Sequence, residues 1–204
     1  MRKARVRHKP KLAADGVLHR AARRRPIAGM TLIAPLALSA TLVEAGISLR
    51  PVAADDRPFL EGLYRIVRWD EFAATGWPDA AKAAFLASQF DLQRRGYGMT
   101  NPEAELYVVC HGVEPIGRLY IDRSGRDLEL VEISLLADWR GRGLGAAFLA
   151  LLQDAARAGG HERVRLTVTP DNPARRLYRR AGFVETSPAS QYGEAYVEMI
   201  WAVS

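Results

Sequence analysis

Cysteine is almost missing from this sequence, since Cys110 is the only one among 204 residues. A single cysteine excludes a disulfide within the chain and fits a reducing compartment, so we expect the protein in the cytoplasm. Cys110 lies in the apolar run LYVVC and is expected to be a buried strand residue rather than a nucleophile. Metal-ligand spacing of cysteine and histidine is also missing, and we expect a protein that works without a metal.

Most of the chain also lacks excess positive charge, although its net charge is +6. Residues 1–25 hold ten of the 29 Lys and Arg and one of the 23 Asp and Glu, which leaves the remainder with a net charge of −3. Proteins that bind nucleic acid over a broad surface carry a basic patch or stripe there. We therefore expect the folded part of the chain not to bind nucleic acid.

A clean apolar segment of membrane-spanning length is missing as well. The uncharged run from Pro26 to Val43 comes near that length, but it contains two prolines, a glycine, two threonines and a serine. We expect residues 1–45 to be a basic and apolar tail that is disordered, or that results from a start placed too early, with Met30 as the true start. Residues 46–204 are expected to be the domain. Two alternatives for the tail are an export signal or membrane anchor, and a basic arm that touches nucleic acid or acidic partners.

Hydrophobic periodicity and turn residues predict a mixed α/β domain. Strands are expected at 47–52, 105–111, 115–122, 127–136 and 163–169, then in the closing runs FVETSP and AYVEMIWAV. Helices are expected at 55–67, 79–95, within 140–160 and at 173–181, with a loop at 68–79 and a turn region at 95–104. The β-α-β passage from 127 to 169 predicts a parallel pair of strands. The fold class is thus α/β, with a central mixed sheet of about six or seven strands flanked by helices.

The segment RGRGLG, residues 140–145, begins a helix that is otherwise well built for burial. Glycine costs about 1 kcal/mol against alanine inside a helix, so Gly143 and Gly145 need a reason. A helix start offers unpaired amides and a partial positive charge, and glycine lets an anion approach them closely. With Arg140 and Arg142 adding charge, the segment predicts a phosphate site. A plain glycine-rich turn with two solvated arginines is the alternative.

The segment matches neither of two common nucleotide-binding motifs. Its glycines are spaced differently from G-x-G-x-x-G, and the G-K-[ST] of a Walker loop is missing. What is present is R-x-x-G-x-G, followed further along by N-P-A-R-R-L-Y-R-R-A-G-F, which starts at Asn172. These two motifs, in this order and on these element types, resemble those of the GNAT family of N-acetyltransferases. The resemblance covers residues 46–204.

The resemblance implies that the strands at 127–136 and 163–169 splay apart and that acetyl-CoA, as co-substrate, lies between them. Backbone groups at the end of the first strand would pair with its pantetheine, namely those of Leu135, Leu136 and Ala137. Backbone amides at the next helix start would bind its pyrophosphate, namely those of Arg140, Gly141, Arg142, Gly143, Leu144 and Gly145. The amide of Leu136 would also polarise the thioester carbonyl, and Asn172 would hydrogen-bond the pantetheine arm. The implied reaction is direct acetyl transfer to a primary amine.

Two side chains are candidates for proton transfer. The resemblance places Tyr178 near the sulfur, where it would protonate the leaving thiolate as a general acid, unless it only packs on the sheet. Glu132 interrupts the apolar run LVEISLL, and burial without a partner is expected to raise its pKa, which would suit a general base. A Glu132 paired with Arg118 or Arg165 is the alternative. Glu129, nearer the strand start, is expected to be solvated.

The acceptor is open between a small amine, a protein N-terminus and a lysine. The resemblance implies a groove shaped by the early helices and by the loop before the last strand. The aromatic walls and carboxylates available there are Trp69, Trp77, Tyr97, Tyr192, Asp70, Glu71, Asp91 and Glu194. Each of these side chains is alternatively a core aromatic or a solvated loop carboxylate.

Two other functions compete with the enzymatic one. A non-catalytic acyl-CoA-binding regulatory module would keep the phosphate site and lack the acceptor site. A nucleic-acid-associated protein would act through the basic N-terminal arm. We expect a monomer or a homodimer, with the apolar run AYVEMIWAV as a candidate dimer edge.

Overall fold

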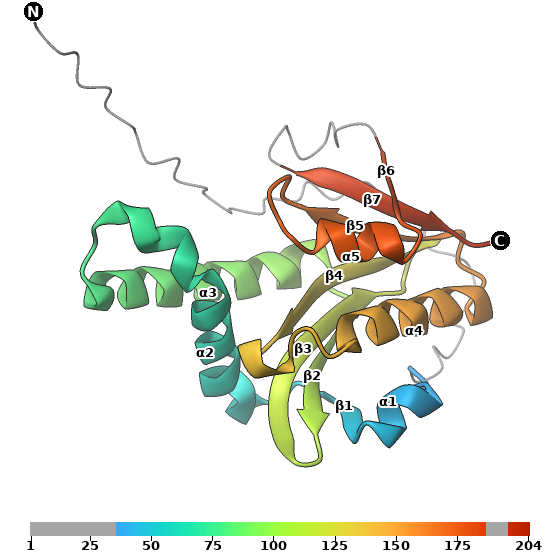
Figure 1. The fold of residues 1–204 in the computed structure, drawn as a ribbon, viewed down its shortest axis with the longest axis horizontal. Helices are drawn as coiled ribbons and strands as arrows, with labels where there is room; N and C mark the ends of the chain where they lie inside the picture. The colour runs from blue at the N-terminus through green and yellow to red at the C-terminus, as the bar shows by residue number, and fades with distance from the viewer. Residues whose placement is uncertain (1–35, 187–195) are drawn as a thin grey trace, which may run out of the picture.

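The computed structural model describes residues 36–186 and 196–204. In these ranges the chain forms a seven-stranded sheet with the order β1-β2-β3-β4-β5-β7-β6 (Figure 1). The strands are β1 (Ile47–Pro51), β2 (Glu105–His111), β3 (Glu114–Asp122), β4 (Asp127–Leu135), β5 (Arg163–Val168), β6 (Val184–Glu185) and β7 (Val197–Ala202). Only β4 and β5 pair in parallel. The predicted mixed sheet with one parallel pair is confirmed.

Helices lie on both sides of this sheet. The α-helices are α1 (Ala40–Glu44), α2 (Arg57–Arg68), α3 (Asp79–Thr100), α4 (Leu144–Ala158) and α5 (Arg175–Arg180), and short 3-10 helices are η1 (Ala54–Asp56), η2 (Trp69–Thr75) and η3 (Ala137–Trp139). Side chains of α1, α4 and α5 join the larger core, whereas α2 and α3 pack on each other in a smaller one. In Figure 1, α2 crosses α3, and the first part of α3 extends well beyond the strands. Over the described ranges, no helix is both long and apolar enough to cross a bilayer.

The larger core fills the space between the sheet and α4. This helix places Phe148, Leu149 and Leu152 against the sheet, and none of these side chains is exposed. Leu119 and Ile121 of β3 meet them from the sheet. Each such burial contributes about 1.5–3 kcal/mol, which more than offsets the cost of glycine at the start of α4.

Along their paired stretch, β4 contains one residue more than β3. Tyr120 of β3 pairs with Glu132, but the next residue, Ile121, pairs with Leu130. Val131 is therefore the extra residue of a β-bulge. The parallel pairing of β4 with β5 also ends here, since Leu130 is the last residue of β4 with a partner on β5.

The bulge reverses which side chains of β4 face the larger core. Leu130 before the bulge and Leu135 after it both belong to that core, although an odd number of positions separates them. In a regular strand, side chains alternate strictly between the two faces. If β4 continued in regular alternation through Val131, Glu132 would share the face of Leu130 and point into the apolar core. Because Val131 forms a bulge, Glu132 points to the opposite face.

Helix α3 is longer than the sequence predicts. The expected turn region at 95–104 is wrong, because α3 continues through Gly96 and Gly98 to Thr100. The glycines cost about 1 kcal/mol each there. Tyr97 offsets part of this cost, because its hydroxyl donates to Glu132 at 2.7 Å. The expected loop at 68–79 also contains the 3-10 helix η2.

Part of the predicted tail belongs to the domain. The expected boundary at residue 46 lies too late, because α1 packs Leu42 into the larger core with none of its side chain exposed. Leu36 and Leu38 pack against the same core. An apolar stretch preceded by basic residues is typical of a leader, whereas here leucine side chains between residues 36 and 43 pack into the domain. Residues 1–35 lie outside the described ranges.

The closing apolar run is an inner strand instead of an edge. The antiparallel partners of β7 are β5 along its whole length and β6 at Met199 and Ile200. The run AYVEMIWAV is therefore not a free edge at Met199 and Ile200, where β6 covers it, and its role in a dimer stays a prediction.

Replacing Leu42 by alanine should lower the free energy of unfolding by about 2–5 kcal/mol, because it leaves a cavity in the larger core. Val43→Ala is the matched control, since the Val43 side chain is 59% exposed in the same helix. It should change stability by less than about 0.5 kcal/mol. Urea unfolding of both variants measures the difference, and a neutral Leu42→Ala would show that α1 lies outside the domain.

Candidate functional site

Glycines at the start of α4 shape the loop where the sequence predicts a phosphate site. Gly141 and Gly143 have φ angles of +72° and +83°, in the left-handed region that glycine adopts without strain. A Cβ at either position would meet no atom within 4 Å, whereas one at Gly145 would lie 2.8 Å from Cδ2 of Leu177. The sequence explanation needs correction on this point. The course of the backbone requires the first two glycines, and the packing of α4 against α5 requires the third.

This loop leaves a row of backbone amides without partners. The amide of Arg140 donates to the carbonyl of Ala137 at 3.0 Å, and that of Ala147 donates to the carbonyl of Gly143 at 3.1 Å. Between them, no group in the described ranges accepts a hydrogen bond from the amides of residues 141–146. These donors stand at the positive end of the dipole of α4. The loop therefore offers a set of donors suited to an anion.

Two arginines add formal charge beside these amides. Nε of Arg140 donates to the carbonyl of Leu135 at 2.9 Å, which holds the side chain at the end of β4. The guanidinium of Arg142 lies 4.9 Å from the centroid of the Trp139 ring. Both arginines are exposed, and neither forms an ion pair with a carboxylate in the described ranges. Both cations thus remain available to a bound anion.

Strands β4 and β5 separate directly beside this loop. Their last pair is Leu130 with Leu166, although β4 continues to Leu135 and β5 to Val168. The amide of Leu136 donates to the carbonyl of Ile116 on β3 at 2.9 Å, so the expectation that it polarises a bound carbonyl is wrong. Because backbone groups of alternate residues point to opposite sides of an antiparallel strand, the amide of Leu135 points to the open side.

Asn172 lies in the turn before α5. Its Oδ1 accepts from the amide of Ala174 at 2.9 Å, and the cap residue of α5 is Ala174. The sequence therefore places the start of this helix two residues too early, because Asn172 closes a turn ahead of it. No group in the described ranges accepts from its Nδ2. The side chain is exposed and keeps donors to offer.

Tyr178 brings a hydroxyl group into the core region between α5 and the sheet. Its side chain is 7% exposed, and its ring centroid lies 6.1 Å from that of Phe183. No hydrogen bond from its hydroxyl is present in the described ranges, and the hydroxyl is not among the fully enclosed polar atoms without a partner, so solvent reaches it. Burial, with a smaller contribution from the charge of Glu132, raises the pKa of Tyr178 to about 12. Tyr178 thus keeps its proton at neutral pH and has a free donor.

Glu132 stands on the opposite face of the sheet at the centre of a polar network. Its Oε1 lies 2.8 Å from Nη2 of Arg118 and accepts from the hydroxyl of Ser134 at 2.7 Å. Its Oε2 accepts from the hydroxyl of Tyr97 at 2.7 Å and from Nε2 of Gln93 at 3.2 Å. A carboxylate offers about four lone-pair positions, and here each oxygen already serves two donors. The carboxylate is therefore fully occupied.

The electrostatics of Glu132 differ from the sequence prediction. Burial alone would raise its pKa, but Arg118 and the hydrogen bonds from Tyr97 and Ser134 outweigh burial and lower the pKa below its ordinary value. The expected rise in pKa is wrong for that reason, and a pair with Arg118 is the alternative that holds. A saturated carboxylate with a lowered pKa is poorly suited to accept a proton.

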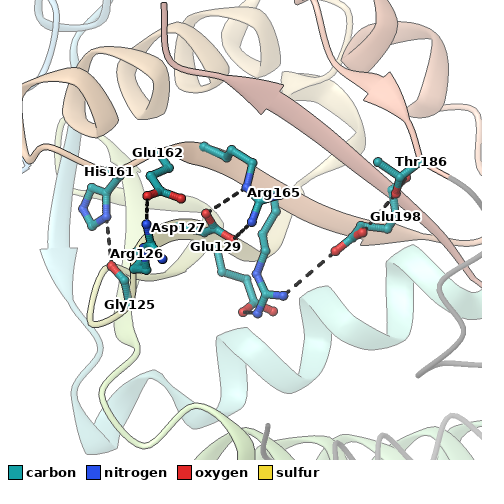
Figure 2. Close-up of polar contacts among 10 residues, drawn as sticks. Gly125, Arg126, Asp127, Glu129, His161, Glu162, Arg165, Thr186 and Glu198 are labelled. Atoms are coloured by element: carbon teal, nitrogen blue, oxygen red, sulfur yellow. Dashed lines mark hydrogen bonds and ion pairs between the residues drawn. The ribbon is translucent and has the colours of Figure 1, made fainter. Parts of the chain in front are cut away.

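Glu129 differs from its prediction as well. It is 8% exposed and not solvated, and its Oε2 lies 2.6 Å from Nη2 of Arg165. Figure 2 shows Arg165 between Glu129 and Glu198, with Glu198 reaching Thr186 beyond it. The carboxylates and arginines of β4, β5 and β7 thus neutralise one another on this face. Within the described ranges, no cluster of three or more His, Cys, Asp and Glu is arranged to hold a metal ion.

Among the expected acceptor residues, the structure brings only Tyr97 into contact with Glu132. Asp91 and Glu71 pair with Arg57 and Arg68 at 2.9 and 2.8 Å. The aromatic residues of the α2–α3 connection pack locally, with Trp77 stacked on Phe72 and Trp69 beneath Lys82. Tyr192 and Glu194 lie outside the described ranges. Sequence reasoning missed Gln93 and Ser134, although the i, i+4 spacing of Gln93 and Tyr97 places both on one side of α3.

Comparison with known proteins agrees with this geometry. The profile of the Acetyltransferase (GNAT) family matches residues 61–183, more than half of the chain. The PaiA N-acetyltransferase of Thermoplasma acidophilum, solved in complex with coenzyme A, is similar with a TM-score of 0.58 and 15% identity over 76% of this chain and 98% of that one. An acetyltransferase of Thermus thermophilus has a TM-score of 0.55 and 25% identity over 76% and 96%. The spermidine/spermine N-acetyltransferase SpeG of Vibrio cholerae has a TM-score of 0.52 and 20% identity over 78% and 94%. No curated protein matches the chain.

Replacing Glu132 by glutamine should lower the free energy of unfolding by about 3–5 kcal/mol, because it leaves the buried charge of Arg118 without a counter-charge. Glu71→Gln is the control, since it removes a carboxylate that is 51% exposed from a surface pair. It should cost at most about 1 kcal/mol. Urea unfolding gives both values, and equal losses would contradict the importance of the buried pair.

The same pair predicts a pH dependence of stability. The folded pKa of Glu132 is lowered, so its stabilising contribution is complete above the unfolded value of about 4.3 and is lost as the pH falls through the folded value. Below about pH 4, the wild type should therefore lose stability more steeply than Glu132→Gln. Urea midpoints measured between neutral and acidic pH would show parallel curves if the pair contributed nothing.

Proposed function

Because the chain belongs to the GNAT family of acetyltransferases, we propose that it transfers the acetyl group of acetyl-CoA to a primary amine of a small molecule, a peptide or a protein. The observation that carries the proposal is the row of unpaired amides at 141–146 beside the open edge of β4. A diphosphate supplies the acceptor oxygens that these amides lack, and an extended arm fits an unpaired strand edge. The solved complex of PaiA with coenzyme A supports this choice of ligand.

The residues that would hold the co-substrate follow from the geometry. The amides of Gly141 through Gly145, with the guanidinium groups of Arg140 and Arg142, would bind the pyrophosphate. The open side of β4 near Leu135 would pair with the pantetheine, and the free Nδ2 of Asn172 would donate to the same arm. Apart from Nε of Arg140, which donates to the carbonyl of Leu135, no hydrogen bond from these donors is present in the described ranges, which leaves them available to a ligand.

Bound acetyl-CoA would supply a thioester, a carbonyl carbon activated toward attack by an amine. The separation of β4 from β5 opens the sheet between its two faces, with the anion loop on the side of α4. The acceptor would approach from the other face, which is covered by α3, because Gln93 and Tyr97 of that helix contact β4 at Glu132. Helix α3 thus borders the acceptor's path.

Tyr178 would act on the leaving sulfur by hydrogen bonding. A thiol has a pKa of about 8.5, well below the pKa of about 12 for Tyr178, so complete proton transfer from the tyrosine would be unfavourable by about 5 kcal/mol. Its hydroxyl can instead donate a hydrogen bond that strengthens as negative charge develops on sulfur. The nitrogen–carbon bond would form, the carbon–sulfur bond would break, and the proton lost by the amine would pass to water.

Glu132 does not fit the role of general base that its position in the sequence suggested. Each of its oxygens is occupied, and its pKa is lowered. The acceptor would therefore bind as the neutral amine or lose its proton to water. Glu132 instead supplies a fixed negative charge and holds the side chains around it in place.

A non-catalytic acyl-CoA-binding module is the second candidate function, and the occupied Glu132 is the observation that favours it. Both functions use the same anion loop, so ligand binding alone does not separate them. Release of free thiol from acetyl-CoA, followed against a panel of amines and peptides, separates them directly. Turnover with any acceptor establishes the enzyme, and binding without turnover across the panel supports the module. We also infer a cytoplasmic location from the lone, unpaired Cys110.

Gly143→Glu should weaken coenzyme A binding at least about tenfold, because it places a carboxylate where the pyrophosphate would sit, and one lost charged contact is worth about that factor. Gly76→Glu is the matched control, since Gly76 has a φ of +69° and no atom within 4 Å of its Cβ position, at the end of η2 in the connection between α2 and α3. Both variants carry similar backbone strain. Calorimetric titration with coenzyme A compares them, and equal affinities would remove the assignment of the loop.

Tyr178→Phe should lower kcat about 10- to 100-fold, the effect of one hydrogen bond to a developing charge. The affinity for coenzyme A should stay unchanged, because the hydroxyl has no role in the ground state. Thiol release under saturating acetyl-CoA measures kcat, and calorimetry measures the affinity. An unchanged kcat would mean that Tyr178 only packs in the core.

A further inference from the structure

Helices α2 and α3 are held to each other by apolar contacts that no strand side chain joins. Their core consists of Leu60 and Tyr64 from α2 with Leu86 and Phe90 from α3. The side chains packed around it come from the segments next to these helices, namely Val52, Phe59, Trp69 and Phe72. Helix α2 also packs directly against β3 and β4, whereas α3 has few backbone contacts with the strands, so α3 needs a further attachment to the sheet.

Polar side chains provide that attachment at Glu132. Gln93 and Tyr97 lie one turn apart on α3, and both donate to Oε2 of Glu132, at 3.2 and 2.7 Å. Nη2 of Arg118 on β3 lies 2.8 Å from Oε1 of Glu132 and donates to Oε1 of Gln93 at 3.3 Å. Three elements, α3, β3 and β4, thus meet in one closed set of hydrogen bonds.

Arg118 also connects this set to α2. Its side chain is 2% exposed, and its guanidinium carbon lies 5.8 Å from the ring centroid of Tyr64 and 5.3 Å from that of Tyr120. The Tyr97 ring stands edge-on to Tyr120 at 6.0 Å. The Nε of Arg118 is buried and has no partner in the described ranges. Burying the guanidinium of Arg118 with one nitrogen unpaired costs desolvation energy, so this arrangement contributes little net stability.

We propose that Gln93, Tyr97 and Arg118 are positioning residues, which hold α3 against β4 through Glu132 and so fix the wall of the acceptor site. The proposal rests on the proposed function, because that function places the acceptor on the side of α3. The four side chains contact neither the anion loop nor the open edge of β4 at Leu135. Their effect therefore falls on the acceptor and leaves the co-substrate untouched.

Tyr97→Phe tests this proposal with the smallest change, the loss of one hydroxyl group. Tyr107→Phe is the matched control, because the hydroxyl of Tyr107 donates to a carboxylate oxygen of Glu105 at 2.6 Å on β2. In steady-state acetyl transfer, Tyr97→Phe should raise the KM of the acceptor about tenfold, the effect of one hydrogen bond to a charged group. The KM of acetyl-CoA should not change, and the control should match the wild type.

Arg118 offers a second pair of variants. Arg118→Lys keeps a charge beside Glu132 and should retain part of the acceptor affinity that Arg118→Gln loses. If Arg118 had only a structural role, both variants would be equally impaired, and each would lose as much affinity for acetyl-CoA as for the acceptor. That result would overturn the proposal.

Hydrogen exchange provides a readout that needs no acetyl transfer. In Tyr97→Phe, the backbone amides of residues 94–100 should exchange at least about tenfold faster than in the wild type, because the end of α3 loses its attachment. Unchanged exchange there would overturn the proposal whatever the kinetics show. Faster exchange in Tyr97→Phe, together with a wild type that transfers no acetyl group, would confirm the attachment of α3 and refute the proposed function. A fall in kcat without a change in acceptor KM would make Tyr97 a catalytic residue and would also overturn the proposal.

Discussion

Both faces of the candidate site depend on the bulge at Val131. This one extra residue ends the pairing of β4 with β5 at Leu130 and turns Glu132 out of the apolar core. Unpaired backbone at the end of β4 and an ionised side chain on the opposite face therefore have the same origin. Bulges commonly redirect side chains next to active sites. Here the bulge does so while leaving Leu135 in the larger core, so the strand keeps its packing against α4.

The two faces of the sheet are built on different physical principles. Toward α4 the strands bury leucine, isoleucine and valine, and the contribution of each grows with its buried area. Toward α3 they carry Arg118, Glu132, Glu129 and Arg165, each neutralised by a partner. Buried ion pairs add little net stability, but breaking one leaves an uncompensated charge and costs several kcal/mol. The polar contacts on this face therefore fix the position of α3 more sharply than an apolar contact of equal area would, because apolar surfaces can slide over each other.

The sequence predicts local backbone features of this protein better than side-chain contacts between residues far apart in the chain. The motif from Arg140 to Gly145 and the motif that starts at Asn172 indicate the fold because both depend on local backbone geometry. The bulge has a visible signal as well, since the alternation Leu128-Glu129-Leu130 restarts out of phase at Glu132. The contacts of Glu132 with Gln93 and Tyr97 have no such signal, because these residues lie 39 and 35 positions away. The predicted direction of its pKa fails mainly because Arg118, which the sequence leaves as an alternative partner, forms the pair. The predicted end of α3 is wrong because a hydrogen bond to the sheet overrides the local preference of Gly96 and Gly98 for a turn.

Burial, with a smaller contribution from the charge of Glu132, would let one tyrosine serve the proposed reaction over a wide pH range. Arg140, Arg142 and the amides of the loop concentrate positive potential on one side of the opened sheet, where a polyanionic co-substrate would sit. Glu132, held ionised by Arg118, places a negative charge on the other side and adds to the rise in the pKa of Tyr178. A tyrosine with a pKa of about 12 keeps its proton wherever an amine acceptor is partly neutral. In the proposed reaction its hydroxyl would therefore always be able to donate, and the pH dependence would be left to the acceptor amine.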